Sequence, residues 1–331
     1  MTGLLIALAA GAIVVTAEPP TIALLRRASA IDVPGLRSSH TVPTLRGGGA
    51  PIAAGLLVAA ALMHSAASAA FGIAVALFAA IGLAEDLSGL SVGQRLVLQC
   101  SAGIAVACVL ISPLPTTPAR LAVTAAAAAV WTTGVVNAFN FMDGVNGISA
   151  AHALIGGVAY GCLGAWRAEE FLFAAGAAVA AVALAFLPWN AVRARVFLGD
   201  VGSYTLGAAV AVLAAYAVLH HVPVEAAIGP LALYLADTAW TLQRRIRAGE
   251  RWFEGHRTHI YQRWCDVGWS HQRVTVVSAA GTATLCLLGA VSLTGNPALR
   301  ATADLAGAGL LAIYLGSPAL MAAVPVSRSW P

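Results

Sequence analysis

The sequence predicts an all-α, polytopic integral membrane protein, and its composition, its repeated apolar segments and its distribution of arginines support this prediction. Of its 331 residues, 60% are hydrophobic and only 10% are charged, and the mean hydropathy is +0.83. These values lie outside the range of soluble globular domains. Apolar segments recur from one end of the chain to the other, so we expect a single transmembrane domain over residues 1–331.

The apolar segments predict about eleven membrane-spanning helices, because each helical crossing needs about 20 mostly apolar residues. An odd number of crossings places the two termini on opposite sides of the membrane. The expected helices cover approximately residues 3–25, 48–65, 68–84, 96–112, 120–137, 148–166, 171–188, 203–220, 226–243, 273–294 and 302–322.

The arginines orient these helices. All 18 basic residues are arginine, and all of them except Arg120, Arg167 and Arg300 fall on one side of the predicted membrane. Basic loops stay in the cytoplasm, so the N-terminus is expected outside and the C-terminus inside. This bias also accounts for the net charge of +4 without a nucleic-acid partner. The cytoplasmic loops are expected at about residues 26–47, 85–95, 138–147, 189–202 and 244–272.

The third of these loops is too polar for the interior of a bilayer. Between two apolar segments it carries Asn137, Asn140, Asp143 and Asn146. Carboxamide and carboxylate groups bind a nucleotide or a hydrated metal ion, and nearby glycines let the chain bend around such a ligand. The alternative is a plain polar turn, which needs fewer polar groups than this loop contains.

Other carboxylates lie where predicted helices meet cytoplasmic loops. Glu85 and Asp86 are adjacent and repel each other, so they require a cation, a partner arginine, or a raised pKa on one of them. Asp200 is expected at a helix start, where the free amides and the helix dipole favour a carboxylate. The alternatives are a solvated helix end for the pair and an ordinary N-cap for Asp200. Asp237 is interpreted as a structural partner of Arg244 and Arg245, which follow it on one helix face.

The first cytoplasmic loop combines His40, Thr44 and Arg46 with three glycines at residues 47–49. Hydroxyl, imidazole and guanidinium groups donate hydrogen bonds to phosphate, and glycines allow the backbone to approach a ligand closely. This composition favours a phosphate-binding loop. The alternative is a flexible connection into the second helix.

The fifth cytoplasmic loop is rich in arginine and contains His256, Arg257 and His259. Arginine and histidine at this density suit a diphosphate. The two histidines are spaced as zinc ligands can be, but they lack a nearby carboxylate or cysteine set. Binding of the loop to anionic membrane lipid is a further alternative.

Five motifs, in order, resemble the polyprenyl-phosphate N-acetylhexosamine-1-phosphate transferases. This family includes undecaprenyl-phosphate GlcNAc-1-phosphate transferase and phospho-MurNAc-pentapeptide translocase. The resemblance covers about residues 30–273, and the form of the last motif is more similar to the branch that initiates O-antigen and other surface glycans. The motifs are RSSHTVPTLRGGG, GLAEDLSGLSVGQRLVLQ, NAFNFMDGVNG, FLGDVGS and HRTHIYQR.

The resemblance implies a transferase of the bacterial inner membrane with its active site facing the cytoplasm. Such an enzyme moves an N-acetylhexosamine-1-phosphate from a UDP-sugar to undecaprenyl phosphate and releases UMP, which starts a lipid-linked cell-envelope glycan. The expected cofactor is Mg²⁺, with Mn²⁺ as the alternative ion. The expected partners are the two substrates and membrane lipid, and family precedent also allows a homodimer.

The same resemblance assigns roles to individual residues. Asp200 matches the direct metal ligand, and Asn140 and Asp143 match the pair that lines the nucleotide and metal site. Glu85 and Asp86 match the acidic pair that handles metal or acceptor phosphate, so the expected catalytic set is Glu85, Asp86, Asp143 and Asp200, with Asp143 and Asp200 at the metal. The expected substrate-binding residues are Asn137, Asn140, Asn146, His40, Thr44, Arg46, His256, Arg257 and His259.

Two positions depart from the family pattern. Glu85 stands where many members have Asp, which keeps the charge on a longer side chain. Asn146 also stands where many have Asp, which removes a charge near the expected nucleoside pocket. The sugar, the polyprenol length and the glycan pathway therefore stay open.

Two other functions compete with the transferase. An ion-coupled secondary transporter also combines many helices with acidic side chains, but its acids should lie at mid-membrane in broken helices. A membrane-bound phosphohydrolase would share the metal and pass the phosphoryl group to water.

Overall fold

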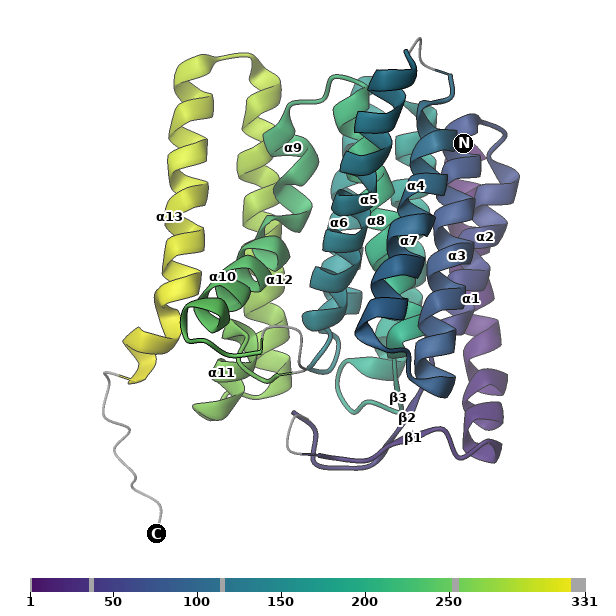
Figure 1. Cartoon of the computed structure of the whole chain (residues 1–331), viewed down its shortest axis with the longest axis vertical. Coiled ribbons are helices and arrows are strands. Elements are labelled where there is room, and N and C mark those ends of the chain that lie inside the picture. The colour runs from purple at the N-terminus through teal and green to yellow at the C-terminus, as the bar shows by residue number, and fades with distance from the viewer. Residues whose placement is uncertain (1, 36–38, 114–116, 252–255, 323–331) are drawn as a thin grey trace.

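The computed structural model describes residues 2–35, 39–113, 117–251 and 256–322, and these form a bundle of long helices (Figure 1). Helix α1 (Thr2–Arg27) starts at the upper end of the bundle in the view of Figure 1, and α13 (Pro297–Ala322) finishes at the lower end. The lower end also holds the three short strands and helix α11 (Ile260–Asp266).

Nine helices in the described part of the chain are long and apolar enough to cross a membrane, which confirms the predicted all-α, multi-pass architecture. Besides α1 and α13 they are α3 (Ala66–Ser88), α4 (Val92–Ile111), α5 (Pro118–Phe141), α6 (Ile148–Arg167), α7 (Glu170–Asn190), α8 (Gly199–Leu219) and α12 (His271–Ala290), which η2 (Val291–Thr294) extends.

Two of the predicted spans take a different form. The segment at 48–65 contains α2 (Ala50–Leu62), which is apolar but only 13 residues long. The segment at 226–243 is divided into α9 (Val224–Ile228), η1 (Gly229–Leu231) and α10 (Ala232–Arg247). Pro230 has no backbone N–H and restricts the chain, which accounts for the break. The total of eleven crossings stays a prediction.

Three short strands, absent from the predicted fold, join the first of the predicted cytoplasmic loops to the fourth. β1 (Ile31–Asp32) pairs antiparallel with β2 (Thr44–Arg46), and β2 pairs parallel with β3 (Val196–Phe197). Arg46 lies opposite Phe197 in this register. The sheet therefore brings Arg46 to the start of α8.

Helix α8 is the most deeply buried of the long helices and packs against α3 and α5. A side chain added at Gly82 of α3 would collide with the backbone of Asp200, and one added at Gly49 would collide with Gly202. Only glycine permits backbones to come this close. The contact at Gly82 places Asp86, one turn further along α3, at the first turn of α8.

The C-terminal part of the chain forms the other side of the bundle, where α10 crosses near the lower end and α12 and α13 stand beyond it (Figure 1). Helix α11 packs against both α12 and α13. Trp264 on α11 donates a hydrogen bond to Ser317 on α13 over 2.8 Å. The fifth loop is therefore anchored to the last helix.

Candidate active site

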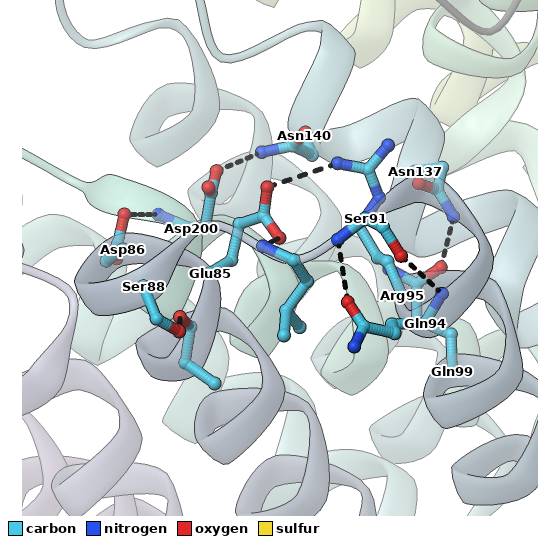
Figure 2. Close-up of polar contacts among 12 residues, drawn as sticks. Glu85, Asp86, Ser88, Ser91, Gln94, Arg95, Gln99, Asn137, Asn140 and Asp200 are labelled. Carbon is cyan, nitrogen blue, oxygen red and sulfur yellow. Dashed lines mark hydrogen bonds and ion pairs between the residues drawn. The ribbon is translucent and has the colours of Figure 1, made fainter.

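Asp86 holds the N-terminus of α8. Its carboxylate accepts the backbone N–H of Asp200 over 3.0 Å and that of Val201 over 2.9 Å, and Figure 2 shows the first of these contacts. The first amides of a helix have no partner within the helix and carry the positive end of its dipole, so an acidic side chain stabilises them. Asp200 itself follows the first helical residue and is therefore not the N-cap.

Arg46 bridges the two aspartates. Its Nε lies 2.7 Å from Asp86 Oδ1 and its Nη2 lies 2.6 Å from Asp200 Oδ2. Burial by itself would lower the pKa of the Arg46 guanidinium, but the Asp200 and Asp86 carboxylates raise it above its ordinary value. Asn140 donates from Nδ2 to Asp200 Oδ1 over 2.7 Å. Two carboxylates and one guanidinium leave a net negative charge that favours a further cation.

Glu85 faces away from this cluster and pairs with Arg95 on α4 (Figure 2). The distance from Arg95 Nη1 to Glu85 Oε1 is 3.3 Å, and Glu85 Oε2 accepts the backbone N–H of Leu90 over 3.0 Å. A partner arginine was one of the three explanations for two adjacent carboxylates. The structure shows one for each carboxylate: Arg95 for Glu85 and Arg46 for Asp86. Arg95 Nε is buried and has no hydrogen-bond partner among the described residues. The guanidinium is therefore incompletely satisfied.

A pocket of about 240 Å³ opens beside the aspartate cluster, between the strands, the α5–α6 turn and the start of α8. It gathers residues from the first, third and fourth predicted loops. The predicted site residues that line it are His40, Arg46, Asn140, Asp143, Asn146 and Asp200. The pocket also takes in Asp32, Asn190, Phe197, Gln262 and His271, which the sequence interpretation did not single out.

Asp143 lies in the α5–α6 turn at this pocket. Burial raises the pKa of its carboxyl to about 7, the Ser149 hydroxyl and Arg46 oppose the shift, and Asp200 and Asp86 reinforce it. The group is therefore close to half-protonated at neutral pH. A cation bound beside it would return it to the carboxylate form.

The donor set suits a hard divalent cation. Asp200, Asp143 and Asn140 supply carboxylate and carboxamide oxygens around one pocket. Mg²⁺ prefers oxygen ligands, keeps several waters and often uses only one or two carboxylates together with substrate phosphates. No group of three or more His, Cys, Asp or Glu side chains gathers as a metal site within the described residues.

Five of the predicted substrate-binding residues are not among those that line this pocket: Asn137, Thr44, His256, Arg257 and His259. Asn137 donates from Nδ2 to Gln99 Oε1 over 2.6 Å, and so ties α5 to α4. Thr44 lines a neighbouring pocket of about 660 Å³ together with Arg193 and Arg195. The two pockets meet at Ser39, His40, Asn146, Phe197 and His271.

The fifth loop folds back onto the first. Arg257 Nε lies 3.3 Å from Ser39 Oγ, and Arg257 Nη2 forms an ion pair of 3.0 Å with Asp266. The His256 ring stacks on His259 with 4.8 Å between centroids. Burial and the neighbouring cationic groups lower the pKa of His256 to about 4, so this imidazole is neutral at pH 7.

The expected pairing of Asp237 with Arg244 and Arg245 is wrong. Asp237 is fully buried, and its partner is His259, whose Nδ1 lies 2.9 Å from Asp237 Oδ1. Arg244 instead donates to the Thr258 carbonyl, over 2.7 Å. Helical spacing places Asp237, Arg244 and Arg245 on one face. It could not reveal that the fifth loop folds back and supplies His259 as a nearer partner for Asp237.

Asn190, at the end of α7, fixes the α5–α6 turn through hydrogen bonds. Its Oδ1 accepts the backbone N–H of Gly147 over 2.7 Å, and its Nδ2 donates to the Val196 carbonyl over 3.0 Å. One buried carboxamide thus joins the turn that carries Asp143 to strand β3. The sequence signal that could have identified Asn190 is a polar residue at the end of an apolar helix.

His271, the first residue of α12, joins two of the loops that line the pocket. Its Nε2 is 3.0 Å from the Ser39 carbonyl, and the backbone N–H of Asn146 approaches its Nδ1 over 3.4 Å. His271 lines both pockets. It lies just beyond the last motif, so motif spacing gave no signal for it.

Comparison with known proteins connects the site to a family. A model described as glycosyl transferase family 4 matches residues 68–218. The decaprenyl-phosphate N-acetylglucosaminephosphotransferase of Mycobacterium tuberculosis H37Rv is 29% identical over 88% of this chain and 83% of its own length. The protein of the same name from Mycobacterium leprae is 30% identical, over 77% and 74%. A phospho-N-acetylmuramoyl-pentapeptide-transferase of Acetivibrio thermocellus is 32% identical over 47% of each chain.

Replacing Asn190 with leucine tests its bridging role. Asn190→Leu is expected to destabilise the protein by about 2 kcal/mol, because it leaves a buried amide and a buried carbonyl without partners. Thermal unfolding in detergent measures the loss. Ser278→Ala is the control, since the Ser278 hydroxyl is buried and has no partner in the described chain, so stability should not fall. Equal stability of the two variants would contradict the bridge.

Proposed function

Because the chain belongs to glycosyl transferase family 4, we propose that it transfers an N-acetylhexosamine-1-phosphate from a UDP-sugar to a polyprenyl phosphate. The observation that carries the proposal is the Asp86–Arg46–Asp200 cluster beside Asp143 in one pocket at a helix-bundle end. The names of the mycobacterial relatives favour N-acetylglucosamine as the first sugar to test.

The reaction exchanges one phosphoanhydride bond for another. An oxygen of the polyprenyl phosphate attacks the phosphorus attached to the sugar, and the bond from that phosphorus to the UMP oxygen breaks. UMP leaves with the bonding electrons, and the lipid phosphate gains the sugar phosphate and becomes a diphosphate linked to the sugar. Because the attacking monoester is already anionic near neutral pH, the protein must mainly neutralise and align the reactants.

Asp200, Asp143 and Asn140 are the residues that would hold Mg²⁺, or Mn²⁺ in its place. The ion would neutralise the donor diphosphate. Arg46 adds a fixed positive charge at the same pocket, and Asp86 keeps Asp200 in place by capping its helix. Asp86 therefore acts chiefly through position, since its carboxylate is already engaged by two amides and Arg46.

The acceptor has a separate approach along the membrane-facing side of α3 and α4. An apolar groove of about 440 Å³ lies between these helices and is lined by Leu77, Ile81, Leu98 and Ala102, among others. The next residues toward the lower end include Arg95, whose Nε has no hydrogen-bond partner among the residues that the structure describes. We infer that the polyprenyl chain lies in the groove and that its phosphate meets this guanidinium, next to the carboxylate cluster.

The position of the site favours a transferase over an ion-coupled transporter. A transporter holds its coupling acids near mid-membrane, whereas the carboxylates here gather at the lower end of the bundle with the strands and β2–α2 loop. A phosphohydrolase could use the same cluster, but its product would differ from that of a transferase. It would pass the phosphoryl group to water and form no lipid-linked sugar.

The enzyme assay combines purified protein, labelled UDP-N-acetylhexosamines, Mg²⁺ and polyprenyl phosphate. We expect UMP and a lipid-linked sugar phosphate in equal amounts. Asp200→Asn should lower kcat by at least about 100-fold, since it removes a charge from the reacting centre. Asp304→Asn, an exposed carboxylate on α13, is the control and should retain full activity. Absence of lipid-linked product with every donor would overturn the proposed function.

Arg95→Gln tests the acceptor site. Loss of the guanidinium should raise the KM for polyprenyl phosphate about tenfold, the value of one charge-assisted hydrogen bond, while the KM for the UDP-sugar changes little. Steady-state kinetics with each substrate varied in turn measure the two constants. Arg27→Gln, an exposed arginine at the end of α1, is the control. A rise confined to the donor KM would remove Arg95 from the acceptor site.

We further propose that the lower end of the bundle faces the cytoplasm of a bacterial inner membrane, as the arginines predict. In a cysteine-free background, Asn296→Cys at the upper end should react with an impermeant maleimide in intact spheroplasts. Gly249→Cys, which follows α10 at the lower end, should react only after permeabilisation. The reverse labelling pattern would invert the orientation.

A further inference from the structure

We propose that buried Asp237 is a positioning residue. It accepts a hydrogen bond from His259 Nδ1 and so directs His259 Nε2 to a phosphate oxygen of the donor. The proposal rests on the transfer function above. It concerns a part of the site that lies opposite the aspartate cluster, where α10, α11 and α13 meet.

Asp237 is an unusually well-bonded carboxylate. It has no exposed surface, and Oδ1 receives His259 Nδ1 over 2.9 Å and Thr241 Oγ1 over 3.1 Å. Its Oδ2 accepts the Tyr314 hydroxyl over 2.6 Å and the backbone N–H of Ile260 over 3.1 Å. These donors come from α10, α11 with its preceding residue, and α13. The carboxylate is therefore fixed in place from three elements.

The contact determines which nitrogen of His259 remains for a ligand. A carboxylate only accepts hydrogen bonds, so Nδ1 must carry a proton toward Asp237. The other nitrogen, Nε2, is covered and has no partner among the residues that the structure describes. A buried polar atom without a partner is unusual in a folded protein. Nε2 thus marks a position that a ligand completes.

The surroundings of His259 connect it to the pocket. Its backbone N–H donates to Gln262 Oε1 over 3.2 Å, and Gln262 lines the pocket beside the aspartates. The next residue but one, Tyr261, donates its hydroxyl to the Phe141 carbonyl over 2.9 Å, at the start of the Asp143 turn. The His259 ring itself lies 6.0 Å from the Phe141 ring, centroid to centroid, beside the start of the same turn.

The arrangement gives Asp237 a chemical role as well as a structural one. A neutral ring with Nδ1–H offers only a lone pair at Nε2, whereas a ring protonated at both nitrogens donates from Nε2. The second form is the one that binds a phosphate oxygen, and the Asp237 carboxylate holds the Nδ1 proton of either form and so presents Nε2 to the ligand. The neighbouring His256 ring, stacked at 4.8 Å, is neutral.

A double-mutant cycle separates this role from a purely structural one. We expect His259→Gln and Asp237→Asn each to lower kcat/KM for the UDP-sugar about 100-fold, with little change in the KM for polyprenyl phosphate. The double variant should lose no more than either single variant, because Asp237 acts through His259. Losses that multiply in the double variant would overturn the proposal.

Tyr314→Phe is the matched control. It removes a donor from the same buried carboxylate but leaves the charge and the His259 contact intact. We expect a lower temperature of unfolding, with kcat/KM kept within about threefold. If Tyr314→Phe reduced kcat/KM as much as Asp237→Asn, the cluster would be structural only, and the proposal would fail.

A spectroscopic readout tests the pair without any turnover. In protein labelled with ¹⁵N-histidine, the His259 Nδ1 proton should resonate far downfield, be absent from His259→Gln, and move upfield in Asp237→Asn. An unchanged resonance in Asp237→Asn would overturn the proposal. If the wild-type protein forms no lipid-linked product but shows this resonance and its shift, the transfer function fails while the Asp237–His259 pair stands.

Discussion

The cap that Asp86 places on the first turn of α8 is the interaction on which the site depends. It requires α3 and α8 to touch, which the glycine at position 82 permits because a larger residue would collide with the Asp200 backbone. The helix dipole and the two amides, which have no partner within the helix, then hold the Asp86 carboxylate at the first turn of α8. The cap fixes the backbone of Asp200, while Arg46 and Asn140 fix its carboxylate.

Charge balance around that cap explains why the cluster suits phosphate chemistry. Arg46 neutralises one of the two aspartates, and Asp143 lies close enough for the other carboxylates to help raise its pKa. The pocket therefore combines a fixed guanidinium with carboxylate and carboxamide oxygens of the kind that Mg²⁺ prefers. In the proposed reaction, two anionic substrates would need positive charge from both the guanidinium and a metal ion.

The opposite wall of the site is built on the same principle with different residues. A buried carboxylate, Asp237, receives donors from three elements and orients an imidazole, as Asp86 receives two amides and orients Asp200. In both cases a buried anion is stable because its oxygens are fully hydrogen-bonded. The fifth loop depends on α13 for this, since Tyr314 reaches Asp237 and Ser317 holds Trp264.

Hydropathy and charge act locally along the chain, so the membrane class, most of the helical segments and the end that carries the polar residues could be predicted from the residues alone. Motif order also identified Asp200, Asn140 and Asp143 as one group, and the structure places them at one pocket. The folded structure was needed to show that Glu85 and Asp86 turn to different arginines and that Asp237 pairs with His259. Only it revealed the bridges made by Asn190 and His271. Those partners are distant in sequence, and no local pattern encodes which buried polar group will meet which.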